Sequence, residues 1–286
     1  MGTSASSSGP GPGVPFVPPW VPPANPPFPQ PFPQPDPPEN LDEDGDVAEQ
    51  PPENEVRPVS PIAPPRRFAA ARRRLGEFGA HGERRNLEAG LGHYVRGGMG
   101  GAARGAARMA GTARTAGALR EVLEALGAGR QPAVDLGFDS RELTGRAARY
   151  VIDIIANAIR PVDGTQDAEA SRDALVAATV DLLSQFQDAD LASLEPEQVD
   201  VIVESYVGHD LCRRVELDVG KAILAKAPDP ATGVRRFNEI RQYIIEKVAA
   251  CFRKRRENGD RLNRGGFTAL TSAVIRDTLG VFEEYL

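Results

Sequence analysis

The chain has 286 residues, with 34 Lys and Arg against 40 Asp and Glu, and a formal net charge of −6. Its two cysteines, Cys212 and Cys251, lie in helical sequence patterns, so we expect no disulfide framework and a reducing, cytoplasmic environment. The longest strongly apolar stretch, 151–159, contains Asp153 and is too short to cross a bilayer, so we expect no membrane segment.

The first nine residues, MGTSASSSG, place a glycine directly after the initiator methionine. Removal of Met1 would leave the Gly2 amine free on a tail of small polar residues. One interpretation is a frayed terminus without a role. The pattern M-G-x-x-x-[ST], completed by Ser6, is also typical of N-myristoylation.

Residues 1–65 are predicted to be disordered. They hold 21 of the 26 prolines, which favour an extended polyproline helix and exclude regular helix or central sheet. Phe16 and Trp20 interrupt the proline run, and each is either an anchor for a partner's groove or part of a solvated spacer. The stretch 36–55 contains nine acids and reads as an acidic linker.

Residues 66–134 form a segment rich in Arg, Gly and Ala, with thirteen Arg and five Glu between 66 and 130. A helix over 102–126 would place Arg104 and Arg108 one turn apart on one face. The arginine excess, which includes Arg114, makes nucleic acid one candidate partner. The alternative is a partly helical arm that docks on an acidic protein surface, including the rest of this chain.

Residues 135–286 are predicted to form an all-α domain of about six helices. The first begins at a capping box of Asp139 and Glu142, points Tyr150 inward and ends at Pro161. Further helices are expected over 168–187 with Val180 inward, 196–206, 211–227, 237–258 and 267–282. About 150 residues in six amphipathic helices are enough to bury a core.

The search for catalytic chemistry finds little. His209, Asp210 and Cys212 are the nearest approach to a cluster, and Asp210 is explained as a helix cap. A hydrolase centred on His209 and Cys212 therefore remains a minor alternative. We expect no catalytic residues, no metal and no cofactor, because none of the phosphate-loop, dinucleotide, hydrolase or zinc motifs occurs.

A second basic run, FRKRREN, lies near the end of a predicted helix. Its cations are Arg253, Lys254, Arg255 and Arg256. Cations at a helix C-terminus are favoured by the helix dipole, which is one interpretation. A patch that contacts nucleic acid is the other.

Two stretches, MGTS…SGPGPGVPFVPPW at 1–20 and LGHYVRGGMGG…AGTARTAGAL at 91–119, resemble the QatB family, the B component of the Qat anti-phage system. The resemblance implies an ATPase, a QueC-like enzyme and a TatD-like nuclease as partners. QueC-like enzymes build the nitrile of a 7-deazaguanine from an activated carboxylate, and defence relatives attach a deazaguanine to the N-terminal glycine of a protein. The bacterial context argues against myristoylation.

On this resemblance we expect a non-enzymatic defence component that is both a scaffold and a substrate for modification at Gly2. An α-amine has a pKa of about 7.7–8.0 and is a usable nucleophile near neutral pH. Thr3 and Ser4 would be read by the QueC-like partner, with Trp20 as a second anchor. The alternative function is a nucleic-acid sensor that acts through the arginine-rich segment.

Overall fold

The computed structural model describes residues 66–137, 139–258 and 266–286, and the regular secondary structure of this part of the chain is all helix, as predicted. The prediction of disorder for 1–65 lies outside the described residues. The α-helices are α1 (Ala69–His81), α2 (Arg84–His93), α3 (Ala102–Arg108), α4 (Ala110–Gly127), α5 (Ala148–Ile159), α6 (Gln166–Gln185), α7 (Pro196–Lys226), α8 (Pro230–Glu257) and α9 (Phe267–Glu283). A π-helix, η1 (Tyr94–Met99), follows α2, and a 3-10 turn, η2 (Ser140–Leu143), precedes α5.

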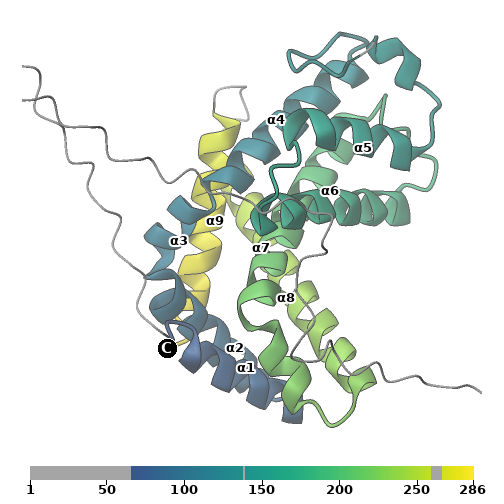
Figure 1. Ribbon diagram of the computed structural model, residues 1–286. Helices are drawn as coiled ribbons and strands as arrows, with labels where there is room; N and C mark the ends of the chain where they lie inside the picture. The colour runs from purple at the N-terminus through teal and green to yellow at the C-terminus, as the bar shows by residue number, and fades with distance from the viewer. Residues whose placement is uncertain (1–65, 138, 259–265) are drawn as a thin grey trace, which may run out of the picture. The chain divides into compact units, whose positions relative to one another are not determined.

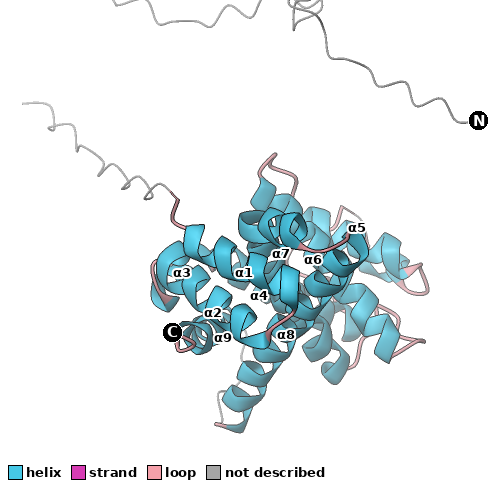
Figure 2. Ribbon diagram, turned by 90° about the horizontal axis from the view of Figure 1, so that it is seen from below, coloured by secondary structure: helices cyan, strands magenta, loops and turns pink. Residues whose placement is uncertain are grey.

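Helix α7 is the central element of the described region (Figure 1). It packs against α8 along most of its length, against α6 on a second side and against α1 on a third. Helix α9 returns beside α3, α4 and α8, so the C-terminal helix covers the arginine-rich segment. Seen from below, the same helices form a closely packed bundle (Figure 2). None of the described helices is long and apolar enough to cross a membrane.

The two helices expected over 196–206 and 211–227 are one helix, so that prediction is wrong. Helix α7 begins at Pro196, where a capping box joins Glu195 and Gln198, and continues to Lys226. Gly208 lies in its middle rather than at a break. A Cβ atom there would lie 3.1 Å from the Cα of Ile245 in α8, so the glycine allows the two helices to approach closely. The predicted number of about six helices therefore does not hold.

The start of the helix predicted from Asp139 is also corrected. Asp139 does act as a cap, accepting a hydrogen bond from the Arg141 backbone N–H, but of the short turn η2. Helix α5 begins only at Ala148. Because its buried face is centred on Val151 and Ile155, Tyr150 is exposed rather than inward.

The face predicted for the next helix is partly wrong. Leu175 and Leu182 of α6 are buried, but Val180 is 62% exposed. The inward side of α6 consists mainly of small residues, among them Ala174 and Ala178. Small side chains let α6 lie close to α7. The periodicity of the large apolar residues therefore predicted the wrong inward side for Val180.

Helix α9 agrees with the predicted range, whereas α8 ends as predicted but begins at Pro230, seven residues before the expected start at 237. Helix α8 starts with Asp229, which accepts hydrogen bonds from the backbone and hydroxyl of Thr232, and ends at Glu257. Of the residues predicted to face inward, Cys251 of α8 is only partly buried, and the others are buried: Phe237, Ile240, Ile244, Val248 and Phe252 of α8 and Phe267, Leu270, Val274, Ile275, Leu279 and Phe282 of α9.

Residues 66–134 supply α1 to α4, and these helices share the core with α7 and α9. The helix expected over 102–126 is divided at Met109 into α3 and α4. A Cβ atom at Gly79 of α1 would lie 2.5 Å from the carbonyl oxygen of Ile223 in α7. The glycines of this segment therefore allow close helix packing instead of preventing helix formation. All described residues belong to one compact unit.

Candidate functional site

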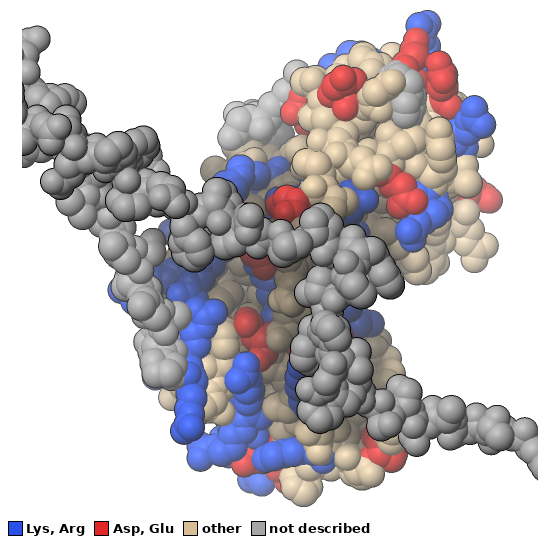
Figure 3. Space-filling model, in the orientation of Figure 1, with Lys and Arg blue, Asp and Glu red and all other residues tan. Residues whose placement is uncertain are grey.

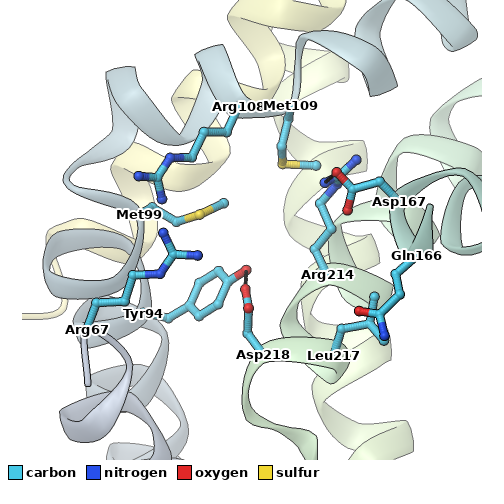
Figure 4. Close-up of a pocket in the computed structure, with 10 residues that line it drawn as sticks. All are labelled: Arg67, Tyr94, Met99, Arg108, Met109, Gln166, Asp167, Arg214, Leu217 and Asp218. Atoms are coloured by element: carbon cyan, nitrogen blue, oxygen red, sulfur yellow. Dashed lines mark hydrogen bonds and ion pairs between the residues drawn. The ribbon is translucent and has the colours of Figure 1, made fainter. Parts of the chain in front are cut away.

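A pocket of about 320 Å³ lies where the arginine-rich segment meets α6 and α7 (Figure 4). Its wall on one side comes from the turn before α1, from η1 and from the end of α3, and on the other side from the first turn of α6 and from α7. The residues that line it are Arg67, Tyr94, Met99, Arg108, Met109, Gln166, Asp167, Arg214, Leu217 and Asp218. Three arginines from distant parts of the chain therefore border one cavity.

Tyr94 and Asp218 form one wall of the pocket. The Tyr94 hydroxyl donates to Asp218 Oδ2 over 2.9 Å, and the fully buried ring stacks on Phe68 with centroids 5.2 Å apart. Burial raises the pKa of the Asp218 carboxyl, although the Tyr94 hydrogen bond and the charges of Arg67 and Arg72 oppose the rise. Burial also raises the pKa of Tyr94, so the tyrosine is a neutral donor at this position.

Arg214 forms the opposite wall and is held by two carboxylates. It makes ion pairs with Asp167 at 3.0 Å and with Asp210 at 3.5 Å. Asp210 also accepts a hydrogen bond from the Thr112 hydroxyl of α4, so this group joins α4, α6 and α7. Because Arg214 is paired on both sides, its charge is largely neutralised inside the chain.

Asp210 does not cap a helix, which corrects the role predicted for it. It lies in the middle of α7 and is fully buried, and burial raises the pKa of its carboxyl despite the opposing charge of Arg214. Its Oδ1 atom is buried and has no hydrogen-bond partner within the described residues. A buried aspartate in this position joins helices and is costly to leave unpaired.

Arg67 and Arg108 differ from Arg214, since neither has a carboxylate within ion-pair distance among the described residues. The guanidinium of Arg67 lies over the ring of Phe68, 4.7 Å from its centroid. Arg108 Nη1 donates to the carbonyl oxygen of Gly98 over 3.4 Å. Both side chains reach toward the cavity in Figure 4, so this side of the pocket can bind an anion.

Basic side chains continue outward from this side of the pocket, and Figure 3 shows Lys and Arg gathered over the lower left of the molecule. Arg104 and Arg114, two of the arginines predicted to contact nucleic acid, are exposed. The pKa of His93 is affected by the positive charge around it. Its pKa is lowered first by burial and then by the nearby charges of Arg74, Arg73 and Arg96.

Two of the four cations of the second basic cluster make ion pairs. Arg255 makes an ion pair with Asp277 of α9 at 2.7 Å, and Arg256 pairs with Glu204 of α7. Arg253 and Lys254 are exposed. The structure thus brings the C-terminal half of this run together with acids of neighbouring helices.

His209 and Cys212 lie three residues apart on α7 and take part in different interactions. His209 Nε2 lies 2.7 Å from Asp181 Oδ2, an oxygen that also accepts from the Ser205 hydroxyl. Burial raises the pKa of the Cys212 thiol to about 11, so it is protonated at neutral pH. Within the described residues there is no group of acids, histidines and cysteines that would hold a metal ion.

A comparison with protein families identifies the chain. The family described as Qat anti-phage system associated protein QatB matches residues 100–282. The chain belongs to the QatB family. Comparisons with curated proteins and with solved structures give no match.

The QatB match runs from the residues just before α3 into α9. It includes Arg104, Arg108 and Arg114 and the pocket residues of α6 and α7, whereas Arg67, Tyr94 and Met99 precede it. The predicted modification and partner residues Gly2, Thr3, Ser4, Phe16 and Trp20 lie outside the described residues as well as outside the match.

Sequence reasoning missed the pocket and its supporting ion pairs. One pattern does point to them: Asp210 follows Tyr206 by four residues, on the buried side of α7, once 196–226 is treated as a single helix. No comparable pattern marks Tyr94 or Asp218, because their contact joins residues 124 positions apart.

Proposed function

We propose that this member of the QatB family acts as a non-catalytic scaffold and as a substrate, and that a QueC-like partner modifies it at Gly2. The observation that carries the proposal is family membership together with a glycine directly after the initiator methionine. The first helix of the described residues begins at Ala69, which lies 67 positions after Gly2 in the sequence.

The chemistry asked of Gly2 is simple acyl transfer. The neutral α-amine attacks the activated carboxylate carbon of a deazaguanine, an amide bond forms, the activating group leaves and the amine gives up a proton. An α-amine with a pKa of about 7.7–8.0 is partly neutral at cytoplasmic pH. Glycine is the least hindered residue for this attack, because it has no side chain.

The residues after Gly2 would determine recognition. Thr3 and Ser4 are small enough to follow the glycine into a narrow channel as an extended strand. Phe16 and Trp20 are proposed as anchors on the partner's surface, since large aromatic side chains dominate the binding energy of such interfaces. The ATPase and the TatD-like nuclease of the same system are the further proposed partners.

Intact-protein mass spectrometry tests the proposal. In cells that contain the QueC-like partner, the mature chain should begin at Gly2 and carry an added mass on that amine. Gly2→Val should abolish both the added mass and phage protection, whereas the matched variant Gly9→Val should retain both. An unmodified N-terminus in protected cells, or protection by Gly2→Val, would overturn the proposal.

Nucleic-acid binding is the second candidate, and the unpaired arginines of the pocket side favour it. Binding driven by phosphates weakens steeply with salt through counterion release. Gln substitution at Arg104, Arg108 and Arg114 should then abolish the binding, with a smaller effect at Arg253 and Lys254. Absence of binding to DNA or RNA by the full chain at about 50 mM salt would remove this candidate.

A further inference from the structure

We propose that the pocket between η1 and α7 binds a small phosphate monoester whose body carries hydroxyl groups, such as a sugar phosphate. The phosphate group would lie between Arg67 and Arg108, and the hydroxyl groups would face Asp218 on the opposite wall. This inference goes beyond the proposed modification of Gly2 and does not depend on it.

Two guanidinium groups make one end of the pocket positively charged. Figure 4 shows the side chains of Arg67 and Arg108 on either side of Met99, both reaching toward the cavity. Neither arginine makes an ion pair with another described residue. The hydrogen bond from Arg108 Nη1 to the Gly98 carbonyl oxygen, at 3.4 Å, is longer than the usual N–H···O distance of about 2.7–3.2 Å. An anion that accepts hydrogen bonds from both guanidinium groups would therefore stabilise two like charges that face one cavity.

The backbone that carries the two arginines is held by close packing. The π-helix η1 has a rare conformation that is frequently found at functional sites. A Cβ atom at Gly98 of η1 would clash with the Phe68 ring, so the glycine allows this ring to pack directly after Arg67. Helix α3 ends at Arg108, where the chain turns at the buried Met109 into α4. Groups positioned in this way before binding lose less conformational freedom when a ligand arrives.

The opposite wall offers hydrogen-bond acceptors, and its positive charge is already paired. Arg214 makes ion pairs with Asp167 and Asp210, so it adds little attraction for an anion. Asp218 uses its Oδ2 atom to accept from the Tyr94 hydroxyl over 2.9 Å, which leaves Oδ1 as an acceptor for a ligand. A carboxylate repels a phosphate but accepts from a hydroxyl group. The two walls therefore orient a ligand that carries both groups.

The remaining lining and the volume limit the size of the ligand. Met99 and Met109 line the pocket and are buried, and their flexible thioether side chains adapt to irregular shapes. The volume of about 320 Å³ lies at the low end of the roughly 300–1,000 Å³ range of ligand pockets. The pocket thus suits a molecule of the size of a sugar phosphate.

A phosphate monoester fits this arrangement better than a carboxylate or a nucleic-acid strand. At neutral pH a monoester carries a charge of about −1.5 to −2, which matches two guanidinium groups, whereas a carboxylate carries one charge. Each phosphate of a nucleic acid also carries one charge and is joined to the strand on both sides. A strand would continue over the exposed surface, where Arg104 and Arg114 lie. The two kinds of ligand therefore depend on different sets of arginines.

A phosphorus NMR titration of the full chain in phosphate-free buffer tests the site, with inorganic phosphate and ribose 5-phosphate as the probes. We expect one ribose 5-phosphate to bind per chain, with a Kd at least about tenfold lower than that of inorganic phosphate, because only the sugar can donate to Asp218. Arg67→Gln and Arg108→Gln should each raise this Kd about tenfold, since each removes a charge-assisted hydrogen bond. The matched variant Arg114→Gln, at an exposed arginine of α4, should change the Kd by less than about twofold.

Two results of this titration would overturn the proposal. One is the absence of ribose 5-phosphate binding up to about 10 mM, which is weaker than a specific pocket would give. The other is an equal loss of affinity in Arg108→Gln and Arg114→Gln, because a diffuse basic surface of the kind that binds nucleic acid would then account for the binding.

A second variant tests the orientation of the ligand. Asp218→Asn keeps an acceptor for the Tyr94 hydroxyl and removes the negative charge. Inorganic phosphate should then bind more tightly and ribose 5-phosphate less tightly, so the ratio of the two Kd values should shrink about threefold or more. Circular dichroism should show the same helix content in every variant. An unchanged ratio in a folded Asp218→Asn protein would contradict the proposed contact between the sugar and Asp218.

Discussion

The two basic clusters of this chain differ in the partners that their arginines have. In the run 253–256, Arg255 and Arg256 reach acids on α9 and α7, and half of the charge is neutralised within the bundle. Around the pocket, Arg67 and Arg108 find no carboxylate among the described residues, although Arg214 across the cavity has two. Whether an arginine stabilises the fold or is left for a partner depends on which helix lies opposite it.

Of the substitutions that test this comparison, Asp210→Ala should lower the free energy of unfolding the most. The change leaves Arg214, which is only 14% exposed, without its buried carboxylate and removes the acceptor for Thr112. Breaking one partner of a buried pair typically costs about 3–5 kcal/mol in free energy of unfolding. Urea denaturation measures the loss, and Asp173→Ala, at an exposed pair with Arg213, should cost less than about 1 kcal/mol. Equal losses would show that a buried ion pair contributes no more to stability than an exposed one.

The free energy of unfolding measured as a function of pH should show the effect of burial on Asp210. Its folded pKa is raised by burial, so the folded state binds the proton more tightly than the unfolded state. The stabilisation from this group is complete below the unfolded pKa of about 3.9 and is lost as pH rises through the folded pKa. Subtracting the curve of Asp210→Asn from that of the wild type should give a difference that falls over this window. A flat difference would contradict the raised pKa.

Glu204→Ala should remove the ion pair with Arg256 and lower the free energy of unfolding by less than Asp210→Ala does. Arg256, which is 35% exposed, would lose its partner but keep contact with water and with Asp200 at 3.9 Å. We expect the free energy of unfolding to fall by about 1 kcal/mol. The freed cation should also raise the salt concentration at which the protein leaves a heparin column. A loss of stability as large as that of Asp210→Ala would show that the Glu204–Arg256 pair behaves like a buried pair.

The smallest effect should appear at His93. Removing two of the charges that lower its pKa, with Arg73→Gln and Arg96→Gln, should move that pKa upward, while the part due to burial remains. Proton NMR of the imidazole measures the shift, and His81, which is exposed, serves as the reference within the same spectra. The stability should change by less than about 0.5 kcal/mol, because neither arginine makes an ion pair with another described residue. An unchanged pKa would show that the charges of Arg73 and Arg96 do not act on His93.

Local patterns in the sequence determined much of this protein. The spacing of Phe237, Ile240 and Ile244 specifies the body of α8 without reference to the rest of the chain, and α9 is specified in the same way, whereas the first turns of α8 after Asp229 were not predicted. Composition alone separated a proline-rich acidic segment from an arginine-rich one. These features depend on propensity, capping and periodicity, which act over one or two turns.

Tertiary structure decided the remainder. The continuity of α7 through Gly208 depends on the close approach of α8, and the burial of Asp210 depends on Thr112, 98 positions earlier. Pairing of Arg255 but not of Arg108 likewise follows from which acids the packed helices bring near. Such contacts join residues far apart in the sequence, and a charged side chain carries the same local pattern whether its partner is another helix or a second molecule.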